Sequence, residues 1–99
     1  MNVNVQSIHF DADIKLVNFI KEKLGKLTLF HDGILASDVT LRVGPEGERP
    51  ENKHAEIRLA VPGNDLFAKR KAVSFEEAAV NAIEALRNQL EKDKAKVRG

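Results

Sequence analysis

The longest helical pattern in the chain lies between residues 74 and 90, where apolar residues recur three or four positions apart. That spacing places them along one face of an α-helix, and no Gly or Pro interrupts it. Ser74 followed by Glu77 forms a capping box, so we expect the helix to begin at this point. The expected buried stripe consists of Phe75, Ala78, Ala79, Ala82, Ile83, Leu86 and Leu90.

A second helical pattern begins near residue 13 and runs to about Lys26. Asp11 or Asp13 is expected to cap it, because a short carboxylate accepts hydrogen bonds from the free amides of a first turn. Gly25 lowers the helix propensity near the other end. The expected stripe consists of Leu16, Val17, Ile20, Leu24 and Leu27.

Apolar and polar residues alternate in four shorter stretches, which is typical of strands that bury one face. Val3 and Val5 mark the first strand, which we expect to end near His9. The other three strands are predicted at residues 37–43, 54–61 and 66–72. The connection 44–52 contains two Pro and two Gly among polar residues, so we expect it to be a mobile hairpin loop.

The predicted order of elements is therefore β-α-β-β-β-α. A helical crossover between the first two strands favours parallel neighbours, whereas the short later connections favour an antiparallel meander. Both helices have to bury an apolar stripe, so we expect them on one face of a four-stranded mixed sheet with the other face solvated. The sequence predicts a two-layer α+β fold in a single domain, residues 1–99.

Positive charge is unevenly distributed in a chain whose formal net charge is only +1. Lysines cluster in the first helix, and after Leu90 the apolar stripe of the second helix gives way to a basic overhang at about 91–99. A single surface cation is usually only solvated. Helices packed side by side, however, bring their cationic flanks together, with strand four contributing at its end, and such a groove attracts phosphates. The candidate RNA-binding residues are Lys23, Lys26, Lys69, Lys71, Arg87, Lys92, Lys94 and Lys96.

The amino-acid composition excludes several other classes of protein. The chain has no cysteine, which excludes a disulfide framework and a thiolate metal site and fits a reducing cytoplasm. No apolar run approaches the roughly 18 residues of a membrane helix, and the N-terminus lacks the layout of a signal peptide. We therefore expect a cytoplasmic protein that does not bind a membrane.

Catalytic equipment is sparse in this sequence. The three histidines are far apart and none lies at ligand spacing from another, so we expect no metal site and no other cofactor. The serines have no recognisable nucleophile elbow, and the Gly44–Glu48 loop is acidic and contains a Pro that cannot donate an amide to phosphate. We expect neither an enzyme nor a small-molecule substrate.

A family resemblance rests on the element order and on two segments of the sequence. These segments are Lys23–Leu27 and Leu86–Lys92, the second followed by an alternating basic tail. Over nearly its whole length the chain resembles a short member of the ribosome hibernation promoting factor family, also called the sigma-54 modulation or ribosome-associated inhibitor family. The sequence departs from the family pattern at Ala85 and Asn88, where Lys and Arg are common, and at Glu76, where an aromatic residue often stands.

The resemblance implies a fold like that of double-stranded RNA-binding domains. It also implies binding to the small ribosomal subunit, in the channel that otherwise holds messenger and transfer RNA, and hence a block of translation in stationary or starved cells. Lys23, Lys26 and Lys92 match the family's basic positions and would contact ribosomal RNA phosphates. Away from the ribosome we expect a monomer.

A second interpretation stays open on the sequence alone. The exposed sheet edge or the overhanging helix would instead bind a protein, as the older family name implies for a modulator of a transcription factor. Salt distinguishes the two, since phosphate-dominated binding weakens steeply with salt and apolar binding does not. Whether ribosomes would be paired or only silenced singly also stays open.

Overall fold

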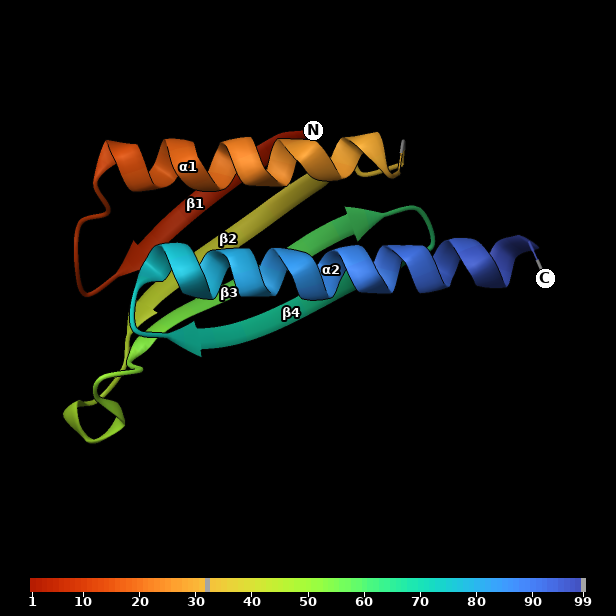
Figure 1. The fold of residues 1–99 in the computed structure, drawn as a ribbon. Helices are drawn as coiled ribbons and strands as arrows, with labels where there is room; N and C mark the ends of the chain where they lie inside the picture. The colour runs from red at the N-terminus through yellow and green to blue at the C-terminus, as the bar shows by residue number, and fades with distance from the viewer. Residues whose placement is uncertain (32, 99) are drawn as a thin grey trace.

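Four strands form one mixed sheet in the order β1-β2-β3-β4, and two helices cover one face of it (Figure 1). The computed structural model describes the backbone of residues 1–31 and 33–98, and the side chains of these residues as far as Lys92. The elements are β1 (Asn2–Ile8), α1 (Ile14–Gly25), η1 (Lys26–Leu29), β2 (Ala36–Val43), η2 (Glu46–Glu48), β3 (Lys53–Val61), β4 (Asn64–Ala72) and α2 (Phe75–Arg98).

Strand pairing follows from the lengths of the connections. The helical crossover through α1 makes β1 and β2 parallel, with Val5 opposite Val39, whereas the tighter connections make the other two pairs antiparallel. Gly63, in the turn between β3 and β4, has a φ of 85°, a left-handed conformation that glycine adopts without steric cost. The predicted α+β fold, element order and mixed sheet are confirmed.

Side-chain caps fix where both helices begin. The Ser74 hydroxyl accepts a hydrogen bond from the Glu77 amide at 3.1 Å, as the capping box predicts. At α1 the cap is Asp13, whose carboxylate accepts from the Lys15 amide at 2.9 Å, so Asp13 rather than Asp11 has this role. Each cap satisfies an amide that has no partner inside its helix.

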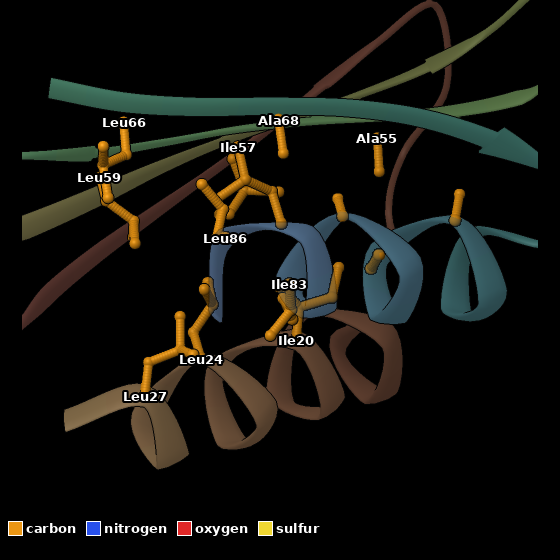
Figure 2. Close-up of a cluster of buried hydrophobic side chains, with 14 of the residues drawn as sticks. Ile20, Leu24, Leu27, Ala55, Ile57, Leu59, Leu66, Ala68, Ile83 and Leu86 are labelled. Atoms are coloured by element: carbon orange, nitrogen blue, oxygen red, sulfur yellow. The ribbon is translucent and has the colours of Figure 1, made fainter. Parts of the chain in front are cut away.

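The hydrophobic core fills the space between the helices and the sheet (Figure 2). Ile20 and Leu24 of α1, Leu86 of α2, and Ile57 and Leu59 of β3 are all completely buried. Burying one such side chain contributes about 1.5–3 kcal/mol, so this layer holds the helices on the sheet.

Small side chains line the contact of α2 with the sheet. Ala78, Ala79 and Ala82 are completely buried on α2, and Ala68 and Ala72 are buried on β4. Because a methyl group occupies little depth, the helix lies close to the strands, and it packs on β3 and β4 while α1 packs on α2 and β1. The end of α2 projects past the sheet (Figure 1).

Two short 3-10 turns were not predicted. The first helix ends at Gly25, and η1 continues it, so the buried Leu27 comes from the 3-10 turn rather than from the helix. The loop 44–52 contains η2 and is anchored rather than loose, because Glu48 Oε1 lies 2.7 Å from Nε2 of the buried His54 and the Gly44 amide donates to the Asn52 carbonyl at 2.7 Å.

Candidate nucleic-acid interface

A groove of about 330 Å³ is lined by residues from both helices and from the 3-10 turn between α1 and β2. One wall comes from the end of α1 and the 3-10 turn after it, and the other comes from the middle of α2. The lining residues are Lys23, Lys26, Leu27, Leu29, Phe30, Val80, Ile83, Glu84 and Arg87.

Helix periodicity explains the wall that α2 provides. Val80, Ile83, Glu84 and Arg87 are spaced three, one and three residues apart, so they form one stripe along the helix, adjacent to the stripe that contacts the sheet. Ile83 belongs to both stripes, since it is only 9% exposed and also lines the groove. The residues that hold the helices together therefore also set the width of the groove.

Three cations and one carboxylate face the groove. Lys23, Lys26 and Arg87 carry the positive charge, and Glu84 carries the single negative charge. Within the part of the chain that the structure describes, none of the three cations forms an ion pair. A narrow concave surface with an excess of unpaired positive charge attracts anions.

Aromatic rings support two of these cations. The Lys23 ammonium lies 5.5 Å from the centroid of the Phe19 ring, and the Arg87 guanidinium carbon lies 5.5 Å from that of Phe30. Both distances are within the range of cation–π attraction, which restricts where each charge lies. The Nε atom of Arg87 is buried and has no hydrogen-bond partner among the described residues.

The prediction that Lys69 and Lys71 join this groove is wrong. Alternate residues of a strand face opposite sides of a sheet, and the buried Ala68 and Ala72 occupy the helix side of β4. Lys69 and Lys71 therefore lie on the opposite face, where the Lys71 ammonium is 3.4 Å from Oε2 of Glu48. Nearness to α2 along the chain therefore does not bring these lysines to the groove, because the strand alternation decides which face they occupy.

The remaining predicted cations lie along α2 beyond the groove. Lys92 is exposed but does not line the groove, because five residues along a helix correspond to a rotation of about 140° from Arg87. The side chains of Lys94 and Lys96 lie outside the described residues.

Sequence reasoning missed the apolar part of the groove. Leu29 and Phe30 are 82% and 42% exposed, and both fall between the first predicted helix and the strand at 37–43, where no helix or strand was predicted. Across the groove Val80 is 36% exposed. The apolar run Leu27–Phe30 is the signal that could have indicated an ordered turn, because a solvated connection seldom carries three large apolar residues.

The histidines occupy three separate places. His9 follows the end of β1 with a φ of 69°, His31 accepts a hydrogen bond from the Gly33 amide at 2.9 Å, and His54 contacts Glu48. Among the residues described, no three His, Cys, Asp or Glu side chains are grouped so as to hold a metal ion. No described helix is both long and apolar enough to cross a membrane.

The fold and the groove define a class of small α+β domain in which two helices lie on one face of a mixed sheet and cations gather where they meet. The family model described as "Sigma 54 modulation protein / S30EA ribosomal protein" matches residues 3–98. The chain belongs to this family, which confirms the resemblance found in its sequence. That description names a ribosomal protein and a sigma 54 modulation protein, and it mentions no catalytic activity.

Two solved structures have the same fold. The Thermus thermophilus Protein Y N-terminal domain superposes with a TM-score of 0.79 at 22% identity, covering 93% of this chain and 98% of that one. A ribosomal subunit interface protein from Coxiella burnetii superposes with a TM-score of 0.84 at 18% identity, covering 96% of this chain and 99% of that one. No curated protein matches the chain in sequence.

Proposed function

We propose that this protein inhibits translation by binding small-subunit ribosomal RNA, in the channel that otherwise holds messenger and transfer RNA. The observation that carries the proposal is the convergence of Lys23, Lys26 and Arg87 on one groove. These cations come from two helices that are distant in sequence, in a chain of a family whose description names a ribosomal protein.

The chemistry of the groove suits a phosphate backbone. Each cation that neutralises a phosphate releases condensed counterions, and the logarithm of affinity falls with that of salt by about 0.7–0.9 per contact. With Lys92 as a fourth contact, raising salt from about 50 to 200 mM lowers affinity roughly 50- to 150-fold. The basic overhang of α2, with Lys94 and Lys96, extends this interface in the proposal.

Charge reversal tests the proposal with a matched control. We compare Lys23→Glu/Lys26→Glu with Arg58→Glu/Lys69→Glu, which changes the charge equally at two exposed positions on the solvated face of the sheet. Co-sedimentation with purified small subunits should be lost for the groove variant only. Any residual binding should have a salt slope lower by roughly 1.4–1.8, which corresponds to two phosphate contacts.

The channel itself is tested by competition. Small subunits already loaded with messenger and transfer RNA should not bind the wild-type protein, and the protein should inhibit translation in a purified system. If both double variants bind as the wild type does, the groove is not the binding face. Binding that is indifferent to loaded RNA would place the protein elsewhere on the subunit.

A protein partner is the second candidate, and one observation favours it. Phe67 is 48% exposed on the solvated face of the sheet, in a shallow hollow lined also by Asp38, Thr40, Glu56 and Arg58. An exposed aromatic ring with a polar rim resembles the centre of a protein interface. Binding to a transcription factor through this face would depend little on salt and would be weakened by Phe67→Ala.

A further inference from the structure

Phosphate recognition does not explain the exposed apolar residues of the groove between α1 and α2. Cations alone would suffice to hold a phosphate backbone, yet the groove exposes Leu29, Phe30 and Val80 to solvent. Exposing these side chains disfavours the free protein, because each leaves apolar surface in water. Exposed apolar side chains beside cations fit a ligand that has both a flat apolar part and negative charge.

Flat groups face the groove from both walls. The Phe30 ring comes from the turn after η1, and the Arg87 guanidinium comes from α2 and lies over that ring at 5.5 Å. Nucleobases stack on aromatic rings and on guanidinium planes alike. Phe30 and Arg87 both line the groove, so either flat group can contact a base held there.

We propose that the groove seats one unstacked nucleobase of a single-stranded RNA segment against Phe30, with the neighbouring phosphates on Lys23 and Lys26. This inference rests on the proposed function, since it names the part of the RNA that the same groove holds. The volume of about 330 Å³ is near the lower end of the 300–1,000 Å³ of small-molecule sites, which suits one base rather than a helix or a duplex.

Charge selects RNA over a protein segment as the occupant. The groove presents three cations against one carboxylate, so its surroundings are those of an anionic ligand. An apolar peptide side chain would cover the exposed apolar residues but would leave Lys23, Lys26 and Arg87 without counter-charges. A nucleotide satisfies both requirements within a single residue.

A pair of matched phenylalanines tests the inference. Phe30→Ala removes a ring that is 42% exposed in the groove, and Phe67→Ala removes one that is 48% exposed on the opposite face. Phe30→Ala should weaken binding to small subunits roughly 5- to 150-fold, the loss typical of one base–aromatic stack, with an unchanged salt slope. Phe67→Ala should bind as the wild type does. Phe30→Leu keeps apolar bulk without the flat ring, and it should weaken binding even if Phe30→Ala fails to fold.

Fluorescence gives a direct readout of stacking. The chain contains no Trp and no Tyr, so Phe30→Trp introduces its only strong fluorophore, and Phe67→Trp is the control. Single-stranded oligoadenylate should quench Trp at position 30, whereas an RNA duplex of the same length should not, because its bases are already stacked. Trp at position 67 should respond to neither RNA.

The outcomes separate this inference from the proposed function. If wild-type protein does not bind small subunits, the proposed function fails and the inference fails with it. If the wild type binds and both Phe30→Ala and Phe30→Leu bind equally well, only the inference is overturned. Weaker subunit binding by the Phe30 variants without quenching by oligoadenylate would assign the groove to a ribosomal protein segment, which also overturns it.

Discussion

The anchored loop between β2 and β3 makes a sharp prediction at Gly44. A Cβ atom placed there would contact Oε1 of Glu48 and lie 2.7 Å from Nε2 of His54, closer than real Cβ contacts allow. Because the His54 ring is only 7% exposed and cannot move freely, Gly44→Ala has to displace the Glu48 carboxylate and break its hydrogen bond to His54. Gly47 lies in the same loop and has no atom within 4 Å of its Cβ position, so Gly47→Ala is the matched control.

The size of the effect follows from the two opposing terms. Leaving the buried Nε2 of His54 without a partner costs about 1–3 kcal/mol. Replacing glycine by alanine stabilises the folded state by about 0.4–1 kcal/mol, because it restricts the conformations of the unfolded chain. We expect a net loss of about 1 kcal/mol for Gly44→Ala, which in a domain of this size lowers Tm by about 4–8 °C, whereas Gly47→Ala should leave Tm unchanged or raise it.

The pH dependence of the Tm difference identifies its cause. The hydrogen bond from His54 is the main reason that the pKa of Glu48 is lowered, and the Lys71 ammonium at 3.4 Å assists it. A carboxyl whose folded-state pKa is depressed adds stability above its unfolded pKa and loses that stability as pH falls through the folded pKa. We therefore expect the Tm difference between wild type and Gly44→Ala, measured by circular dichroism, to have its full size above pH 4.5, the ordinary pKa of a Glu carboxyl. The difference should shrink as the pH falls below that value. Equal Tm values for the two glycine variants at neutral pH would refute the reasoning.

Two further predictions concern the core and the caps. Leu86→Ala removes a completely buried side chain from the layer in Figure 2. It should lower the free energy of unfolding in urea by about 2–5 kcal/mol. Val80→Ala, at a position that is 36% exposed, should lower it by well under half as much. Ser74→Ala removes the hydroxyl that accepts a hydrogen bond from the Glu77 amide and should lower the free energy of unfolding by about 0.5–2 kcal/mol. Ser74→Asp should retain most of the stability, because an Asp side chain can also cap the helix. Equal losses for the two variants would mean that Ser74 does not stabilise the protein by capping.

Local chemistry explains which features of this fold could be predicted. The start of α2 depends on a hydroxyl three residues before an amide, and such a signal lies entirely within Ser74–Glu77. The sheet order follows from connection lengths in the same local way. Lys69 and Lys71, by contrast, were placed by their distance along the chain, although the strand alternation visible at Ala68 and Ala72 already indicates the opposite face.

The groove could be predicted only in part, because it depends on contacts between residues that are distant in the sequence. Its cations were predictable from two cationic helix flanks, and the structure brings Lys23, Lys26 and Arg87 together in one groove. Its exposed apolar residues were not predictable, because Leu29 and Phe30 follow the end of α1 and their exposure depends on the 3-10 turn that Gly25 precedes. Whether an apolar residue after a helix is buried or exposed depends on what packs opposite, which only the tertiary structure decides.

Packing against the sheet fixes the separation between the two walls of the groove. The buried alanines of α2 hold that helix close to β3 and β4, and α1 contacts α2 through its own stripe, with Ile83 shared between the core and the groove. A larger side chain at Ala82 would force α2 away from the strands and would move Arg87 relative to Phe30. The core and the candidate site are therefore parts of one packing arrangement. If a core substitution changes the distance between the helices, we expect it to alter ligand binding even when the domain stays folded.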